Sequence, residues 1–215
     1  MFKKILIGLV VIIGGLCAFI ATRPSAMHIE RTVTVAAPAE VAFAQVNDFH
    51  NWKAWSPWEK LDPTMKTTFS GAATGPGAHY AWVGNKEVGE GAMTITSAQP
   101  NEKVVIKLEF IKPWTATNIV TFGFKGTGDS TAVTWAMDGE QNFMMKAMGV
   151  FMNMDKMIGD DFDKGLADLK KAAEADAKKR AEDAAKAAAP PPPAADAPGA
   201  PAAPAPPAAP AAAKK

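Results

Sequence analysis

The histidines, carboxylates and hydroxyls of this 215-residue chain form no recognisable catalytic or metal-binding motif. His28, His50 and His79 are far apart, and none belongs to the His-Glu-x-x-His pattern by which a helix presents metal ligands. There is also no Gly-x-Ser-x-Gly nucleophile turn, phosphate-binding loop or dinucleotide fingerprint. The single cysteine, Cys17, excludes an intramolecular disulfide and a thiolate cluster. We therefore expect no metal, no cofactor and no assigned catalytic residue.

Methionines are concentrated towards the end of the part of the chain that can fold as a domain. Unbranched thioether side chains adapt to irregular shapes, which suits a helix that lines a cavity for apolar ligands. Ordinary core filling is the alternative, although a uniquely packed core prefers leucine and isoleucine. Copper binding is disfavoured because no histidines accompany the methionines. The group consists of Met144, Met145, Met148, Met152, Met154 and Met157.

Three tryptophans, Trp52, Trp55 and Trp58, are spaced by three residues in a segment that also contains Pro57. Indole rings bury a large area, and their N–H groups need partners when they are buried. The simplest interpretation is that this segment wedges a loop onto the core. A gate at the mouth of a pocket and contact with membrane headgroups are the two alternatives.

Hydrophobic periodicity predicts the elements that must position these residues. Short connections such as Gly84-Asn85 and Lys112-Pro113 leave no room for crossover helices, so the strands must form an antiparallel sheet. Pro38 and Glu40 are suited to the first turn of a short helix after the first strand. The strands are expected at 29–35, 65–70, 78–83, 88–97, 103–111, 115–124 and 131–137.

One face of the predicted sheet is apolar along several strands, as at Val104, Ile106, Leu108 and Phe110. The opposite face carries polar residues, so the apolar face needs a cover. Apolar residues recur at helical spacing over 142–171, which predicts one long covering helix. The sequence thus predicts an α+β fold, with a curved, seven-stranded antiparallel sheet wrapped on a long C-terminal helix.

The N-terminus predicts a membrane anchor over residues 1–26. Residues 5–21 form an apolar run without a charge, close to the shortest helix that spans a bilayer. A cleaved signal peptide is the alternative, although the small residues of a cleavage site are poorly placed. Lys3 and Lys4 favour a cytoplasmic N-terminus. We expect a single-pass protein of the inner membrane, with its domain on the periplasmic side.

The C-terminal segments differ from the domain in composition. Residues 172–189 are rich in Ala, Lys and Glu and predict a solvated extension of the helix. Residues 190–215 are almost entirely Pro and Ala, which predicts an extended, disordered tail. The tail either has no partner or docks a protein partner. The domain itself is expected over 28–171.

Charge excludes one class of partner. The chain has 23 basic and 22 acidic residues, for a net charge of +1. No strong field therefore attracts it to nucleic acid, and we expect no nucleic-acid partner.

Three stretches carry a resemblance to a known family: VAAPAEVAFAQVNDFHNWKAWSPWEKLDP at 35–63, GEGAMTI at 89–95 and FMNMDKMIGDDFDKGLADLK at 151–170. With the predicted order of elements, they resemble the START-like, helix-grip superfamily called SRPBCC. These stretches look like bacterial members described as polyketide cyclase/dehydrase and lipid-transport-like proteins. The resemblance implies the helix-grip fold over 28–171. It implies no particular activity, because this fold hosts carriers, receptors, cyclases and co-chaperones.

The leading hypothesis is a membrane-anchored module that binds a hydrophobic small molecule or a lipid-like ligand between the sheet and the helix. The alternative is a cyclase- or dehydratase-type enzyme that draws an acid or base from His79, Tyr80 or Glu90. A scaffold that docks partners through the Pro/Ala tail is a third hypothesis. The residues expected to contact the ligand are Tyr80, Trp82, Met93, Phe110, Phe122, Trp135, Met145, Met148 and Met152.

Overall fold

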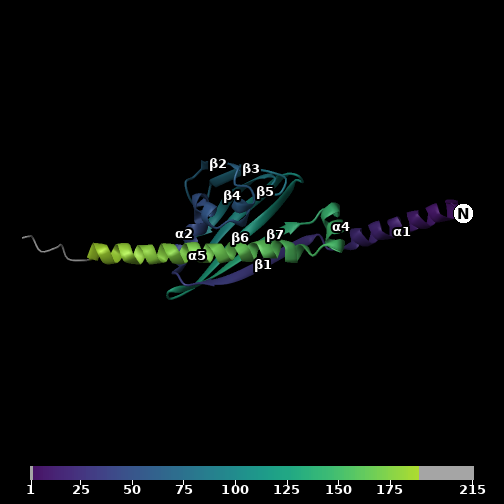
Figure 1. Ribbon diagram of the computed structural model, residues 1–215. Helices are drawn as coiled ribbons and strands as arrows, with labels where there is room; N and C mark the ends of the chain where they lie inside the picture. The colour runs from purple at the N-terminus through teal and green to yellow at the C-terminus, as the bar shows by residue number, and fades with distance from the viewer. Residues whose placement is uncertain (1, 189–215) are drawn as a thin grey trace, which may run out of the picture.

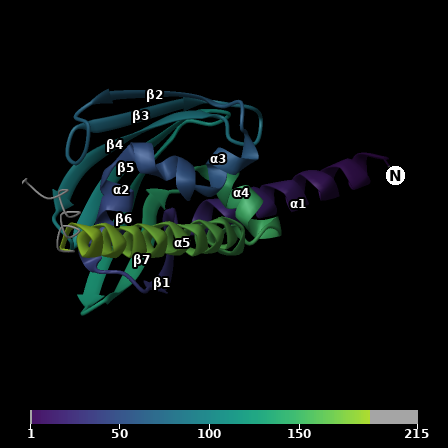
Figure 2. The ribbon, with the colours of Figure 1, turned by 60° about the vertical axis from the view of Figure 1, so that its left-hand side comes forward.

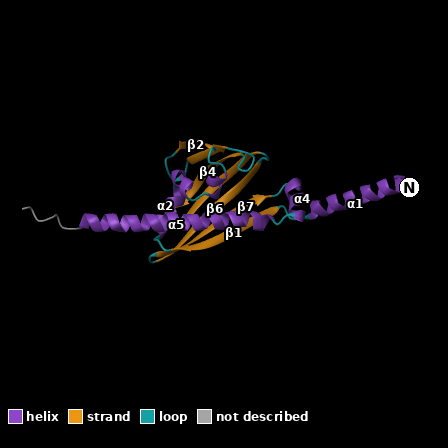
Figure 3. Ribbon diagram, in the orientation of Figure 1, coloured by secondary structure: helices purple, strands orange, loops and turns teal. Residues whose placement is uncertain are grey.

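The computed structural model describes residues 2–188 and shows a curved sheet that partly surrounds a long helix (Figures 1 and 3). All seven predicted strands are present. The Pro/Ala tail predicted at 190–215 lies outside the described residues. The strands are β1 (Ala26–Val35), β2 (Lys66–Gly71), β3 (Ala78–Val83), β4 (Glu90–Gln99), β5 (Lys103–Lys112), β6 (Ala116–Thr127) and β7 (Ser130–Glu140). The helices are α1 (Phe2–Thr22), α2 (Ala39–Asn47), η1 (Phe49–Ala54), α3 (Pro57–Leu61), α4 (Phe143–Phe151) and α5 (Met154–Ala188).

The seven strands form one antiparallel sheet in the order β1-β7-β6-β5-β4-β3-β2. This confirms the predicted fold class. Inward residues alternate with outward ones as the period of a strand requires, so Val104 and Ile106 are fully buried whereas Lys103 is exposed. The sheet bends around α5, with α2 and α3 inside the bend (Figure 2). Its concave face therefore encloses both the core and the site described below.

α5 crosses the concave face of the sheet close to β1 and β7, and two glycines allow this approach. At Gly165, a Cβ atom would lie 2.8 Å from the indole ring of Trp135. At Gly159, a Cβ atom would overlap the guanidinium of Arg31. Arg31 on β1 forms ion pairs with Asp155 and Asp163 of α5, at 3.2 and 3.5 Å. Packing and charge thus hold the first half of α5 on the sheet.

Aromatic side chains from four elements fill the centre of the domain, and we call this group the aromatic core. Trp135 stacks on Phe162 of α5 with ring centroids 4.2 Å apart. Trp55 is fully buried, and its indole N–H donates to the carbonyl of Gln45. The simplest interpretation of the tryptophan run thus holds for Trp52 and Trp55. The aromatic core consists of Trp52, Trp55, Phe122, Trp135 and Phe162.

The prediction of one continuous helix over 142–171 is wrong. The chain leaves the helical conformation at Met152, which has extended backbone angles, so α4 and α5 are separate helices. Asn153 caps the new helix, because its side chain accepts a hydrogen bond from the backbone N–H of Lys156. α4 consequently turns away from α5 and contacts the end of α1 instead of lying along the sheet (Figure 1).

α1 and the end of α5 leave the domain at opposite ends (Figure 1). Among the described residues, α1 is the one helix long and apolar enough to cross a membrane, a test that a signal sequence also passes. Ile20 is its single buried residue. α5 continues to Ala188 without interruption, so the described part of the extension, residues 172–188, is helical.

Candidate functional site

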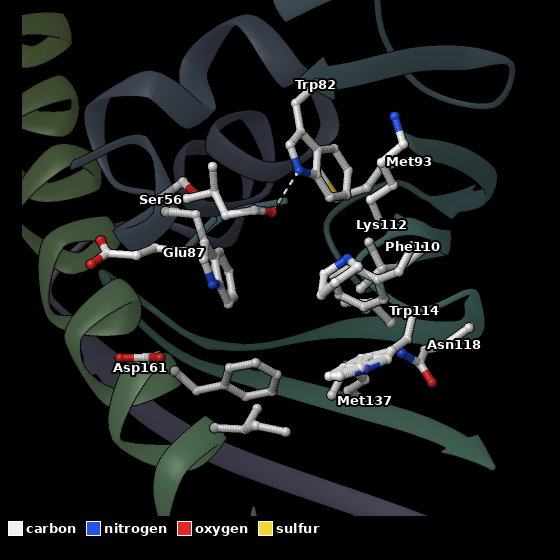
Figure 4. Close-up of a pocket in the computed structure, with 18 of the residues that line it drawn as sticks. Ser56, Trp82, Glu87, Met93, Phe110, Lys112, Trp114, Asn118, Met137 and Asp161 are labelled. Atoms are coloured by element: carbon white, nitrogen blue, oxygen red, sulfur yellow. Dashed lines mark hydrogen bonds between the residues drawn. The ribbon is translucent and has the colours of Figure 1, made fainter. Parts of the chain in front are cut away.

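A cavity of about 360 Å³ lies between the sheet, α3, α4 and the start of α5. Its walls are predominantly apolar, and they include Val120 and Met137 from the sheet and Ile158 from α5. Figure 4 shows the hollow, with Ser56 and Glu87 on the left and Phe110 and Trp114 on the right. Ligand pockets in proteins commonly begin at about 300 Å³ and have this apolar character with a few polar groups.

Seven of the nine residues expected to contact a ligand line this cavity. The side chains from the sheet are buried or half-buried, and those from α4 are half-buried. Contact with a ligand itself stays a prediction for all of them. The seven are Tyr80, Trp82, Met93, Phe110, Trp135, Met145 and Met148.

The other two do not line the cavity, for different reasons. Phe122 is fully buried within the aromatic core, beneath Trp55 and Trp135. Met152 lies in the break between α4 and α5 and is 45% exposed. Both residues were predicted to contact the ligand from periodicity alone. Periodicity shows which face of an element is apolar, but it does not distinguish a filled core from a cavity.

A hydrogen-bonded pair, Tyr80 and Glu59, places polar groups at the cavity wall. The Tyr80 hydroxyl donates to a carboxylate oxygen of Glu59 across 2.7 Å. Burial is the main cause that raises the pKa of the Tyr80 hydroxyl, and the adjacent Glu59 carboxylate raises it further. Tyr80 therefore remains a protonated donor at neutral pH, and Glu59 retains acceptor capacity for a ligand.

Asn118 is a second polar group at the wall, on β6. The residue is 5% exposed, and its carboxamide lies over Gly139 on the neighbouring strand, where a Cβ atom would overlap it. Figure 4 shows Asn118 beside Trp114, across the hollow from Ser56. A carboxamide can both donate and accept, so this position suits a hydroxyl or carbonyl group of a ligand.

Of the three titratable residues considered for catalysis, the structure places only Tyr80 at the cavity. His79 faces the other side of β3, where its ring lies 3.0 Å from the Thr94 hydroxyl. Glu90 pairs with Lys112 at 2.6 Å. Successive side chains on a strand point to opposite faces of the sheet, so His79 and Tyr80 cannot both face the cavity. The sequence alone already contained this information.

The loop between β3 and β4 closes one side of the cavity. The backbone N–H of Asn85 donates to Asp62, and the indole N–H of Trp82 donates to the carbonyl of Val88 (Figure 4). Hydrogen bonds from Thr64 and from Asn85 lower the pKa of Asp62. The carboxylate thus stays charged at neutral pH and holds the loop.

Sequence reasoning missed several lining residues, most of which lie outside regular strands. For Trp58, the tryptophan run was the signal, and one proposed alternative was a pocket gate. For Met144 and Met154, the methionine group was the signal. Residues in turns and short helices, such as Ser56 and Trp114, follow no periodic pattern. The missed residues include Ser56, Trp58, Glu59, Met65, Glu87, Val88, Trp114, Asn118, Met144, Met154 and Ile158.

Within residues 2–188, no group of three or more His, Cys, Asp or Glu side chains is arranged to hold a metal ion. The histidines instead pair locally. His28 lies 2.7 Å from Asp138, and His50 lies 2.7 Å from Asp48.

The fold agrees with the comparisons to known proteins. Residues 26–174 match the family described as polyketide cyclase / dehydrase and lipid transport, and the chain belongs to this family. No curated protein matches the chain significantly.

Among solved structures, the Aha1 dimer from Colwellia psychrerythraea is 17% identical with a TM-score of 0.50, over 69% of this chain and 96% of that chain. A protein from Thermobifida fusca is 22% identical with a TM-score of 0.49, over 68% and 92%. One from Chromobacterium violaceum is 13% identical with a TM-score of 0.49, over 70% and 99%. The likeness to the first of these shows the shared fold alone.

Proposed function

We propose that this protein is a membrane-anchored module that binds a hydrophobic small molecule or a lipid-like ligand in the cavity. The observation that carries the proposal is the cavity of about 360 Å³, whose apolar wall is interrupted by Tyr80, Glu59 and Asn118. An apolar body of the ligand would lie against the sheet, and a hydrogen-bonding group would reach one of these polar side chains. The family description, which includes lipid transport, supports the same class of ligand.

We further propose that α1 remains attached and spans the inner membrane, with the domain on the periplasmic side. The helix has 21 residues, about 32 Å at 1.5 Å per residue, which matches the hydrocarbon core of a bilayer. Its side chains are exposed except at Ile20, as expected of a helix whose surroundings are lipid. Lys3 and Lys4 precede the apolar run and favour a cytoplasmic N-terminus.

The test compares two tryptophan substitutions on β5. Leu108 lines the cavity, so Leu108→Trp should fill it. Val105 points to the opposite face of the same strand, so Val105→Trp is the matched control. The full chain is extracted into polymer nanodiscs without detergent, and its ligands are measured by native mass spectrometry before and after incubation with fatty acids.

The proposal expects a hydrophobic ligand on the unchanged chain and on the Val105→Trp variant, and its loss from the Leu108→Trp variant. Circular dichroism verifies that both variants are folded. The proposal is overturned if no ligand, native or added, responds to Leu108→Trp.

The Tyr80–Glu59 pair favours one second candidate, an enzyme that uses an acid or base in the cavity. Glu59 could accept a proton from a bound substrate, while Tyr80 orients the carboxylate by its hydrogen bond. The test compares the turnover of candidate substrates by the Glu59→Gln variant with that by the unchanged chain. An unchanged rate removes this candidate, whereas a loss of rate with retained binding supports it.

A further inference from the structure

α4 is held against the end of α1 by the segments that flank both helices. The backbone N–H of Gln141, two residues before α4, donates to the carbonyl of Ser25, which follows α1, across 2.7 Å. Ile20, in the last turn of α1, is the one buried residue of that helix, and α1 contacts α4. Only three residues join α1 to β1, a reach of roughly 14 Å at most. If α1 spans the bilayer, α4 must therefore lie at the bilayer surface.

The surface of α4 is unusual for a helix in water. Its sequence is FMMKAMGVF, with one lysine and no carboxylate, and none of its residues is buried in the protein. Phe151 is 79% exposed, Met144 58% and Phe143 49%. A short helix with this composition buries apolar area when it enters the interfacial layer of a membrane, where its lysine can remain with the headgroups.

Exposed residues that line the cavity lie at this same end of the domain. Because the sheet is antiparallel, the start of β1 and the end of β7 lie at the same end as the turn between β5 and β6. That turn contains Trp114, which lines the cavity and is 47% exposed. Tryptophan is enriched at membrane interfaces. Opposite it, α4 contributes Met144, Met145 and Met148 to the cavity wall.

We infer that α4 lies in the interfacial layer of the membrane and forms the entrance of the cavity, so that the ligand exchanges directly with the bilayer. The methionines of α4 are both the wall of the cavity and the surface next to the lipid. Flexible thioether side chains can move aside to admit an apolar molecule without a preformed channel. This inference rests on the proposed function and names the source of the ligand as the lipid bilayer.

Site-specific labels test the position of α4 in the full chain reconstituted in liposomes. In a Cys17→Ala background, an environment-sensitive fluorophore is attached at Phe151→Cys on α4. Gly8→Cys within α1 reports the bilayer interior, and Lys186→Cys in the last turn of α5 reports water at the other end of the domain. Quenching by lipids with nitroxides on their acyl chains is compared with quenching by aqueous iodide.

The label at 151 should be quenched by the lipid nitroxides and protected from iodide, as at position 8 and unlike position 186. A label at 151 that iodide quenches as it does at 186 overturns the inference. So does a label that neither quencher reaches, because a protein contact then covers α4. Loss of residues 2–22 from the mature chain, read from its intact mass, also overturns it.

A kinetic measurement tests the entrance itself. Phe143→Ser combined with Phe151→Ser removes two exposed anchors that do not line the cavity. This variant should load a fluorescent fatty acid from vesicles more slowly, on the order of tenfold, because each ring contributes to interfacial partition. Ile119→Ser removes an exposed apolar residue from the outer face of β6 and is the matched control.

An unchanged loading rate overturns the inference, even if the ligand still responds to Leu108→Trp. In that case the proposed function stands and only the route of entry is wrong. Absence of any ligand that responds to Leu108→Trp is a separate failure, which removes the proposed function.

Discussion

The aromatic core and the α4 end of the domain are filled in opposite ways. In the aromatic core, large rings are fixed by stacking, as Trp135 is on Phe162, and by indole hydrogen bonds, as Trp55 is to Gln45. At the α4 end, half-buried methionines surround a hollow, and no residue of α4 is buried. The comparison indicates that the core provides stability and a unique structure, while the α4 end retains space and adaptability for a ligand.

The largest expected effect is the loss of a ring from the aromatic core. Trp55→Ala should lower the free energy of unfolding by about 3–5 kcal/mol, because the side chain is fully buried and the cavity left behind cannot collapse. Chemical denaturation of the full chain in detergent measures this change. A loss below about 1 kcal/mol would show that the aromatic core does not carry the stability assigned to it.

The next effect concerns the contact between α5 and the sheet. Gly165→Ala should lower the free energy of unfolding by about 1–3 kcal/mol, because its Cβ atom would lie 2.8 Å from Trp135 and 3.0 Å from Pro57. Gly149→Ala is the matched control on α4, where the nearest atom to a new Cβ would be 4.0 Å away. An equal loss at both positions would contradict the difference between the two regions.

Truncation of a methionine at the α4 end should have a smaller effect. Met148→Ala is expected to lower the free energy of unfolding by less than about 1 kcal/mol, since the side chain is half-buried beside an existing hollow. The same variant should change ligand affinity or selectivity, as measured by competition between fatty acids of different length. A stability loss as large as that of Trp55→Ala would show that α4 is an ordinary part of the core.

The smallest effect is electrostatic and links α3 to α5. Lys60 and then Lys171 lower the pKa of Asp168. Because the folded-state pKa lies below that of the unfolded chain, this contribution is present above about pH 4 and is lost as the pH falls through the folded-state value. Asp168→Asn should lower the free energy of unfolding by less than about 1 kcal/mol at pH 7. It should also reduce the fall of the melting temperature as the pH is lowered below about 4. An unchanged fall of the melting temperature would contradict this role of Asp168.

The sheet was predictable because its chemistry is local and periodic. Alternation at Val104 and Ile106 fixed the inner face of β5, and turn residues fixed the antiparallel order. The break at Met152 was missed because the apolar spacing continues through it, although Asn153 followed by Asp155 is a signal for a new helix start. The apolar pattern alone therefore overestimated the length of the covering helix.

The candidate site was predictable only in part. The cavity residues on the inner face of the sheet were predicted correctly as lining residues, because the two-residue period of a strand determines which side chains share that face. Ser56, Glu59 and Trp114 lie on short helices or turns, and their positions depend on tertiary packing that no local pattern encodes. The distinction between Phe122 in the core and Phe110 at the cavity likewise depends on tertiary packing, because Trp52 and Trp55 cover Phe122.

The most direct test of the central claim is to map where a photoreactive fatty acid attaches to the full chain in membranes. A fatty acid with a diazirine on its chain is activated by light, and the modified peptides are identified by mass spectrometry. The account predicts attachment to cavity residues such as Met93 and Val120, retained in the Val105→Trp variant and lost in the Leu108→Trp variant. Attachment confined to α1 and insensitive to Leu108→Trp would contradict it.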